Sequence, residues 1–347
     1  MWRVELLDLA EQVLPTRLRV TGGSLTWGDG QPVIGTGTLD LTIPRGQDPI
    51  PWERVRIRVA HHDRGIVRPC GIWIPQVDGK SIDGPVSRLR VPVADKTELL
   101  NRPIGAWESW PSGTVITSAL AAILTGRGIR SHQITPSSET LPKAVHAEPG
   151  DTWAAAAQRL ADTIGYAPLR ATRDGLLVWA PAAPAEQIPP AATYGADPGH
   201  LRLRPQWEVK TPLYRMPTGV VVHVARPNGL KGWIGRADLP DEHPLSAYSR
   251  GDGDRALGEL LHTETADTTS AAKTQARAEQ RLAEETTAQA IIDYTHPMDD
   301  TEHGDTVTVD PEHATGRITA RTITLGVGAV CQTSIRCSFP GGVYPWI

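Results

Sequence analysis

The sequence contains little cysteine. Its only three cysteines are Cys70, Cys331 and Cys337, and their spacing matches neither a disulfide framework nor a zinc site. Cys331 and Cys337 are six residues apart in an expected strand, too far along one face to bond to each other. We therefore expect three reduced, buried thiols.

Long apolar runs and a leader are also missing. No stretch approaches the roughly 20 apolar residues that a membrane-spanning helix needs. The N-terminal segment 1–15 has neither a basic start nor an uninterrupted apolar centre, so it does not match a signal peptide. These absences predict a protein without membrane segments that is made in the cytoplasm.

A concentrated positive charge is missing as well. Lys and Arg number 35 against 39 Asp and Glu, which gives a net charge of −4. A protein that grips nucleic acid needs a clustered basic face. The arginines of 54–64 recur at strand spacing, which is typical of a solvated strand face. The composition thus excludes a protein whose main task is to bind nucleic acid.

Alternating apolar and polar residues dominate the first hundred positions. In 54–59 the alternation predicts that Val55, Ile57 and Val59 point inward and that Arg54, Arg56 and Arg58 point outward. Turn residues with positive φ are expected at 28–30, 63–65 and 78–79. The expected strands are 2–9, 17–26, 33–43, 54–59, 65–76 and 86–93. Closely spaced strands with such turns predict a small antiparallel barrel over residues 1–98.

A helical period replaces this pattern between residues 99 and 190. We expect one helix at 112–125 with Ser112 as its cap and another at 151–164 with Asp151 as its cap. The strand pair 167–172 and 176–180 follows, and the proline-rich run 181–190 is the best linker candidate. This segment predicts a separate α+β domain.

Strands return in residues 191–347, with one long helix at 269–286. Its Ala272, Ala276 and Ala283, with Leu282, predict a narrow small-residue face suited to close packing. The expected strands lie at 219–225, 233–237, 290–294, 306–309 and within 316–339, with a turn at 227–229. The predicted fold class is mainly β (α+β). It has two small antiparallel β-barrel domains, 1–98 and 191–347, and an intervening α+β domain, 99–190.

Two polar clusters invite a metal interpretation. His61 and His62 are adjacent in a strand and would face opposite sides, so they cannot both bind one ion without a bend. His296, Asp299, Asp300, Glu302, His303 and Asp305 fall within ten residues. Mixed ligands of this kind can bind Zn²⁺ or Ca²⁺, but the EF-hand spacing is missing and Pro297 marks a loop. We favour a solvated turn and predict no metal site.

No motif for catalysis or cofactor binding stands out. Gly35-x-Gly37 does not extend to a dinucleotide-binding loop, and the sequence contains neither a P-loop nor a G-x-S-x-G elbow. Cys70 has no neighbouring base, which favours a buried residue over a nucleophile. Arg250-Gly251-Asp252 in a Gly/Asp-rich loop is attributed to chance. We predict no catalytic, cofactor-binding or metal residues and no enzyme activity.

The segment Val145–Gly165 carries the main functional alternative. It resembles the start of peptidoglycan-binding LysM modules, where a "GDT" turn precedes a helix. Capping by Asp151 and burial of Trp153, Ala157, Leu160 and Ile164 explain the same pattern by packing alone. Packing is favoured, and a cell-wall binding module or a tail-associated cell-wall hydrolase is retained as the alternative function.

Four segments in order carry a family resemblance. They are the glycine-rich strand pair Thr21–Ile43, the run Val145–Trp179, the helix at 268–287 and the "GDTVTV" run Gly304–Leu325. Taken together they resemble the tail-tip, or baseplate, hub proteins of bacteriophages, specifically minor tail proteins of long-tailed actinobacterial phages.

The resemblance implies a structural virion protein. It implies a homotrimer whose two barrel-like domains per subunit approximate a sixfold ring at the phage tail tip, assembled in the host cytoplasm. The implied partners are the distal tail protein, the tape measure protein and other tail-tip or receptor-binding proteins. DNA would pass through the ring only transiently, and neither a membrane nor a cofactor is implied.

Overall fold

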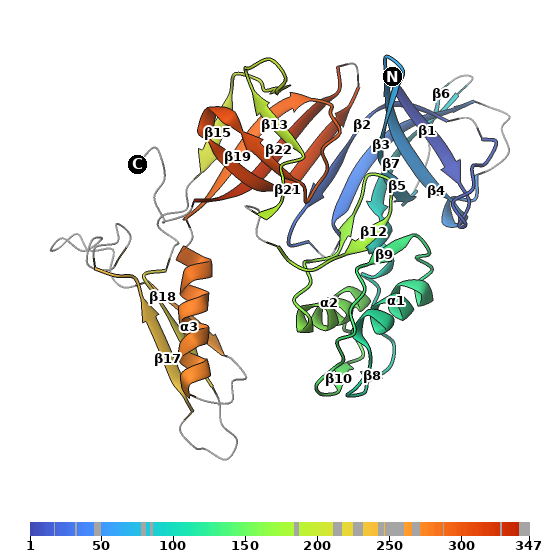
Figure 1. Ribbon diagram of the computed structural model, residues 1–347. Coiled ribbons are helices and arrows are strands. Elements are labelled where there is room, and N and C mark those ends of the chain that lie inside the picture. The colour runs from blue at the N-terminus through green and yellow to red at the C-terminus, as the bar shows by residue number, and fades with distance from the viewer. Residues whose placement is uncertain are drawn as a thin grey trace. The chain divides into compact units, whose positions relative to one another are not determined.

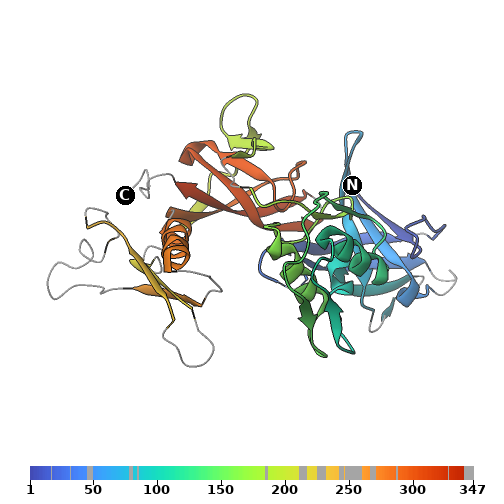
Figure 2. The ribbon, with the colours of Figure 1, turned by 60° about the horizontal axis from the view of Figure 1, so that its bottom comes forward.

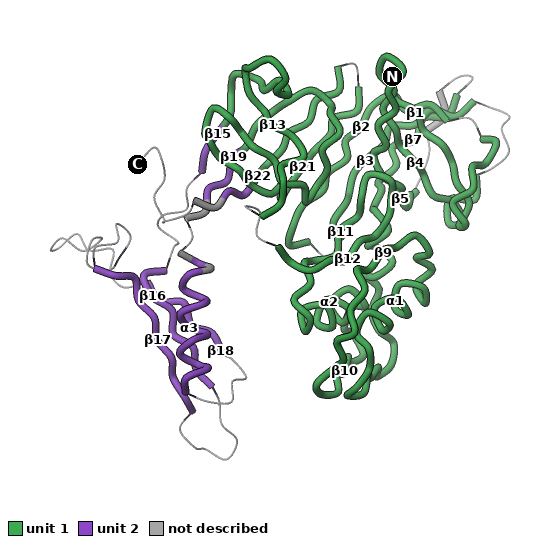
Figure 3. Tube along the Cα trace, in the orientation of Figure 1, with its two compact units in different colours: residues 1–207, 293–335 green, residues 208–292, 336–347 purple. Residues whose placement is uncertain are grey.

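A computed structural model of the chain contains two compact units (Figure 3). Unit 1 comprises Met1–Trp207 and Asp293–Ile335, and unit 2 comprises Glu208–Ile292 and Arg336–Ile347. The structure describes residues 1–16, 18–31, 33–44, 50–77, 81–83, 86–183, 187–210, 217–224, 232–241, 246, 260–265, 271–286, 288–326 and 328–339. The boundary between the units falls inside the predicted third segment, 191–347. The three-part division by composition stays a prediction.

Unit 1 is built on one large sheet with the strand order β1-β4-β5-β7-β3-β2-β21-β20-β13-β14 (Figure 1). Its strands are β1 (Trp2–Leu7), β2 (Arg19–Gly28), β3 (Gly35–Pro44), β4 (Arg56–Asp63), β5 (Ile66–Pro75), β7 (Val86–Asp95), β13 (Ala192–Gly195), β14 (Leu201–Arg202), β20 (Thr306–Val309) and β21 (Ala314–Leu325). Off this path are β6 (Ser81–Asp83), β15 (Trp207–Lys210), β19 (Ala288–Pro297) and β22 (Val330–Phe339).

The N-terminal part of this sheet buries the predicted apolar face. Val55, Ile57 and Val59 are each no more than 3% exposed, as the alternation predicts. Arg64 and Gly65 have the positive φ angles that the turn between β4 and β5 needs. The prediction is wrong for Arg56, which is 5% exposed rather than solvated.

The buried Arg56 interacts with charged groups outside its own strand. Burial lowers the pKa of Arg56, and the negative charge of Glu11 partly offsets this effect. Glu11 in turn accepts a hydrogen bond of 2.7 Å from the buried Lys96. Glu11 and Lys96, which are distant from Arg56 in sequence, therefore lie close enough to interact with its charge.

The strands of unit 1 include pairs that are distant in sequence. β2 pairs with its neighbour β3 on one edge and with β21 on the other, in a register that joins Gly23 to Leu325 and Gly28 to Ala320. Leu25 and Ile323 both contribute to the apolar core that also contains Trp27 and Trp73. β21, from the C-terminal part of the chain, therefore completes the N-terminal sheet.

The predicted α+β segment is present within unit 1. It contains α1 (Ile116–Gly126), α2 (Trp153–Thr163) and the short strands β8 (Glu108–Trp110), β9 (His132–Ile134), β10 (Val145–Ala147), β11 (Arg170–Ala171) and β12 (Leu177–Trp179). The two helices lie side by side in both ribbon views (Figures 1 and 2). Leu120, Leu160 and Trp179 belong to their shared core.

Both predicted helix caps are wrong. α1 starts at Ile116, and the hydroxyl of Ser112 instead donates to the carbonyl of Leu141 at 3.3 Å. α2 starts after Thr152, whose hydroxyl accepts from the backbone N–H of Ala155 at 3.1 Å. A side-chain cap requires the residue immediately before the first helical turn, and Ser112 and Asp151 lie upstream of that position.

Unit 2 contains a three-stranded sheet with one helix packed on it. β16 (Gly219–His223) lies between the antiparallel β17 (Ile234–Asp238) and the parallel β18 (Leu261–Thr265), and α3 (Ala271–Thr286) contacts β16 and β17. Ala278 of α3 is fully buried with Val220 and Val222. The predicted helix is present, but its predicted small-residue face is wrong: Ala272, Ala276 and Ala283 are exposed. Thr274 and Ala278 are buried instead, and Leu282 packs partly buried against the same cluster.

The mainly β fold class with antiparallel sheets is confirmed. Closure of the sheets into two barrels stays a prediction. None of the helices among the described residues is long and apolar enough to cross a membrane. The predicted turns at 78–79 and 227–229, the tripeptide at 250–252 and the segment 340–347 lie outside the described residues.

Candidate functional site

The predicted His/acid cluster at 296–305 is a buried network around Asp299 instead of a solvated turn. Asp299 is 8% exposed and accepts hydrogen bonds from the hydroxyl of Tyr194 at 2.7 Å and from Arg321 Nη2 at 3.0 Å. Thr301 donates both its backbone N–H, at 3.1 Å, and its hydroxyl, at 2.8 Å. His296 Nδ1 lies 2.8 Å from the second carboxylate oxygen.

This network fixes the charge of Asp299. Burial alone would raise the pKa of Asp299, but the hydrogen bond and charge of His296 and the charge of Arg321 outweigh it. The pKa therefore lies well below its usual range, and the carboxylate is ionised at neutral pH. Both oxygens of the carboxylate already have protein partners.

The other acids of this run fasten it to neighbouring strands. Glu302 accepts from the backbone N–H of Arg173 at 2.7 Å, and the Arg173 side chain donates to Asp300 at 3.1 Å. Asp305 Oδ1 lies 3.8 Å from Arg170 Nη1. This hydrogen bond and these ion pairs join the loop after β19 to the β11–β12 hairpin. The prediction of a solvated turn failed because sequence spacing does not reveal which arginines approach from another segment.

The remaining candidates also have packing roles. Cys70 is 1% exposed, and burial raises the pKa of its thiol to about 12, so the thiolate nucleophile is not populated. Cys331 and Cys337 are likewise free and buried. Gly35 and Gly37 sit where strands approach closely. A Cβ on Gly35 would lie 2.8 Å from Asp95 Oδ2, and one on Gly37 would collide with the carbonyl of Ser24.

His61 and His62 follow each other in β4, as predicted. The His61 ring packs on Trp2 with 4.7 Å between centroids. Burial is the largest cause of a lowered pKa of His61, and the N-terminal ammonium adds to it. Neither histidine belongs to a convergent group of metal-ligating atoms among the residues that the structure describes.

The segment Val145–Gly165 packs as its apolar pattern predicts. Ala157 and Leu160 are fully buried, whereas Trp153 and Ile164, predicted to be buried, are half-buried against the same core. The guanidinium of Arg127 lies 4.5 Å from the centroid of the Trp153 ring. A sugar would need an open aromatic face to stack on, and Arg127 occupies one face of Trp153.

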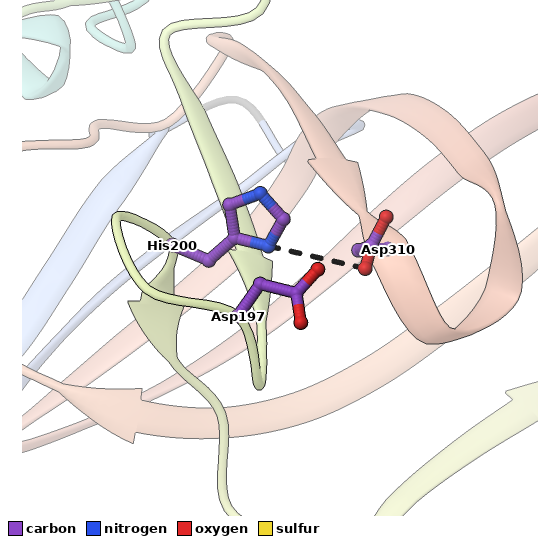
Figure 4. Close-up of side chains that lie close together, drawn as sticks. All are labelled: Asp197, His200 and Asp310. Carbon is purple, nitrogen blue, oxygen red and sulfur yellow. Dashed lines mark ion pairs between the residues drawn. The ribbon is translucent and has the colours of Figure 1, made fainter.

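A group that the sequence analysis missed lies at one end of the unit 1 sheet (Figure 4). β13 runs parallel to β20, with Tyr194 opposite Val309, so the residues that follow both strands emerge together. Asp197 and His200 lie in the turn between β13 and β14, and Asp310 starts the short helix Asp310–Glu312 after β20. Their ligand atoms all lie within 4.8 Å of one another.

The imidazole of His200 faces the carboxylate of Asp310 in this group (Figure 4), with Nδ1 and Oδ2 3.9 Å apart. That distance is too long for a hydrogen bond. The Nδ1 atom is shielded from solvent and has no hydrogen-bond partner. A sequence signal existed, because Asp197-Pro198-Gly199-His200 places two ligand types in one turn, but the third lies 110 residues downstream.

No protein-family model matches the chain, and no curated protein matches its sequence. Solved structures do match. A tail protein from Neisseria meningitidis MC58 aligns with 99% of this chain and 98% of its own, with a TM-score of 0.66 and 14% identity. The 43 kDa tail protein of prophage MuSo2 from Shewanella oneidensis aligns with 96% of this chain and 97% of its own, with a TM-score of 0.64 and 14% identity.

The chain has the fold of a phage tail protein. A third match extends this fold to secretion machinery. It is an Escherichia coli type VI secretion component described as similar to the T4 bacteriophage tail proteins gp27 and gp5. It aligns over 99% of this chain and 78% of its own, with a TM-score of 0.56 and 11% identity. The predicted resemblance to tail proteins is therefore confirmed at the level of fold, and its restriction to actinobacterial phages stays a prediction.

Proposed function

We propose that this chain is a structural subunit of a bacteriophage tail tip, the baseplate hub. In this role it forms a homotrimeric ring that connects the tail tube and the distal tail protein to the adhesion machinery. The ring surrounds the channel for the tape measure protein and DNA. The single observation that carries the proposal is the alignment of 99% of this chain with a Neisseria tail protein at a TM-score of 0.66.

The chemistry of the described residues supports a structural role. The oxygens of the buried carboxylate of Asp299 are hydrogen-bonded or ion-paired with Tyr194, Thr301, His296 and Arg321. The Cys70 thiol is buried, with its pKa raised to about 12. Groups held in this way stabilise one conformation and leave no activated nucleophile or free acid–base pair at these positions. We therefore propose that the protein is not an enzyme.

The sheet of unit 2 offers a surface for neighbouring proteins. One face packs under α3, whereas the opposite face carries Ile234 at 71% exposure beside His223 and Thr265 in register. Arg236 and Asp238 project from the same side of β17. We propose that this face contacts other tail subunits.

Native mass spectrometry of the full-length protein tests the proposal. A hub subunit is expected at about three times its 37.5 kDa mass, or as a larger ring, over a concentration series. Ile234→Lys is expected to shift the distribution toward monomer if the unit 2 face joins subunits. A monomer at every concentration of the series would contradict the ring.

The alternative is a cell-wall binding module or a tail-associated cell-wall hydrolase. Cosedimentation with purified peptidoglycan separates binding from assembly, and a zymogram detects cleavage. A hub subunit is expected to stay in the supernatant and to leave the peptidoglycan gel unchanged. Clearing of the gel by wild-type protein would replace the structural proposal with an enzymatic one.

A further inference from the structure

We propose that Asp197, His200 and Asp310 bind one divalent first-row transition metal ion, with Zn²⁺ as the representative. Two carboxylates and one imidazole are the ligand types that such ions take in proteins. The parallel pairing of β13 with β20 delivers all three side chains to one end of the sheet. The proposal does not depend on the hub function.

The distances suit coordination better than direct pairing. Ligands bind zinc at about 2.0–2.2 Å in tetrahedral geometry, so two ligand atoms of one ion lie about 3.4 Å apart. The 3.9 Å between His200 Nδ1 and Asp310 Oδ2 is nearer to this separation than to a hydrogen-bond length, and a small side-chain rotation brings the two atoms to it. Asp197 is exposed, and its carboxylate closes the group with a small side-chain rotation because all ligand atoms are within 4.8 Å.

His200 supplies an independent observation. Its Nδ1 atom is inaccessible to solvent and without a hydrogen-bond partner, and it faces Asp310 (Figure 4). A shielded polar atom without a partner lowers stability, because water no longer solvates it. An ion between the imidazole and the carboxylate satisfies both groups at once.

Gly195 lies directly beside His200 and Asp310, where a larger side chain would not fit. A Cβ at this position would lie 2.7 Å from His200 Nδ1 and 3.1 Å from the Cβ of Asp310. The φ angle of Gly195 is not positive, so its backbone conformation does not demand glycine. Glycine is required there because His200 and Asp310 approach so closely.

The ligand set indicates which ions fit. Ca²⁺ and Mg²⁺ favour all-oxygen sites with more ligands, whereas an imidazole nitrogen suits Zn²⁺, Ni²⁺ or Co²⁺. Two carboxylates balance the 2+ charge. Three protein ligands leave at least one position for water or for a group from another molecule.

Isothermal titration of the tag-free, chelator-treated full chain with ZnCl₂ tests the site. Wild type is expected to bind one Zn²⁺ per chain. His200→Ala and Asp310→Asn should each weaken binding by at least about 10–100-fold, the loss caused by changing even an outer partner of a metal ligand. Asp197→Asn should weaken it less, because Asp197 is the exposed member.

A neighbouring histidine provides the matched control. His313 is exposed in the same short loop after β20 and has φ +48°, which asparagine tolerates, so His313→Asn removes an imidazole without removing a ligand. This variant should bind zinc like wild type. Circular dichroism confirms that each variant is folded.

Two results overturn the proposal. One is wild-type affinity that His200→Ala and Asp310→Asn leave unchanged, which would mean adventitious binding elsewhere. The other is an absence of stoichiometric binding by wild type, which would make the group a loose His–Asp ion pair. Cobalt absorption between about 500 and 650 nm, present in wild type and in His313→Asn but lost in His200→Ala, gives a second readout of nitrogen and oxygen coordination.

Discussion

Two His–Asp groups lie beside Tyr194 and Gly195, which are neighbours in β13, and the groups differ in how far their hydrogen bonds are satisfied. The group around Asp299 is buried and is reached by Tyr194 of β13, while the group around Asp310 is partly exposed and is reached through Gly195. In the first group, imidazole and carboxylate are 2.8 Å apart; in the second, they are 3.9 Å apart. The same residue types thus form a closed structural network in one place and an open group in the other.

Strand geometry explains how the two His–Asp groups come to lie so close together. Side chains of consecutive strand residues point to opposite faces of a sheet. Tyr194 is fully buried and directs its hydroxyl to Asp299, whereas Gly195 lies beside Asp310 on the other face. The place of a His–Asp pair in the fold, and not its residue types, therefore decides whether the pair stabilises the protein or is available to a ligand.

The largest expected effect comes from breaking the closed network. Arg321→Met leaves the Asp299 carboxylate buried without its cation, and we expect the free energy of unfolding in urea to fall by about 3–5 kcal/mol. Arg202→Met, the same change at an exposed site in β14, should cost under about 0.5 kcal/mol. Equal losses for the two variants would show that the network does not stabilise the unit.

A third carboxylate, Asp95, is expected to make stability depend on pH. Burial raises the pKa of Asp95 to about 6, even though Thr97 and Gly35 donate to it. The unfolded pKa is about 3.9, so this contribution to stability is fully present below pH 4 and is lost as the pH rises through 6. Its size is about 3 kcal/mol.

Asp95→Asn should therefore flatten the dependence of unfolding free energy on pH between pH 4 and 6. The exposed Asp162→Asn should keep the wild-type slope. Urea unfolding followed by tryptophan fluorescence at several pH values measures both. A slope that Asp95→Asn leaves unchanged would place the pKa of Asp95 near its ordinary value.

Two tyrosines allow a hydrogen bond to a charged acceptor to be compared with one to a neutral acceptor. Tyr194→Phe removes a donor to the ionised Asp299 and should cost about 1.5–3 kcal/mol. Tyr166→Phe removes a donor to the carbonyl of Thr135 at 2.6 Å and should cost about 0.5–1.5 kcal/mol. Thermal unfolding of both variants checks the order, and the reverse order would contradict an ionised Asp299.

The smallest effect is expected in the open group. Asp310→Asn in chelator-treated protein should change the unfolding free energy by less than about 1 kcal/mol, because a half-exposed pair 3.9 Å apart contributes little. Added ZnCl₂ should raise the melting temperature of wild type and leave that of Asp310→Asn unchanged. A large loss without metal would show that the group is already a stabilising ion pair.

Local patterns in the sequence predict elements but not their neighbours. Alternation identifies β4 and its inward residues, and a helical stripe identifies α2, because both depend on adjacent positions. The charges that the buried Arg56 interacts with, on Glu11 and Lys96, come from positions distant in sequence. The Asp299 network needs Tyr194 and Arg321, and the open group needs Asp310, so neither site is contained in one stretch of sequence.

The pairing of β2 with β21 has a consequence for synthesis of the protein. Gly23–Gly28 must wait for Ala320–Leu325, so almost the entire chain leaves the ribosome before one edge of β2 is covered. Unpaired strand edges promote aggregation, and contacts between such distant residues form slowly. Nascent and prematurely terminated chains are therefore the species that need chaperones, while the finished chain protects its own first hairpin.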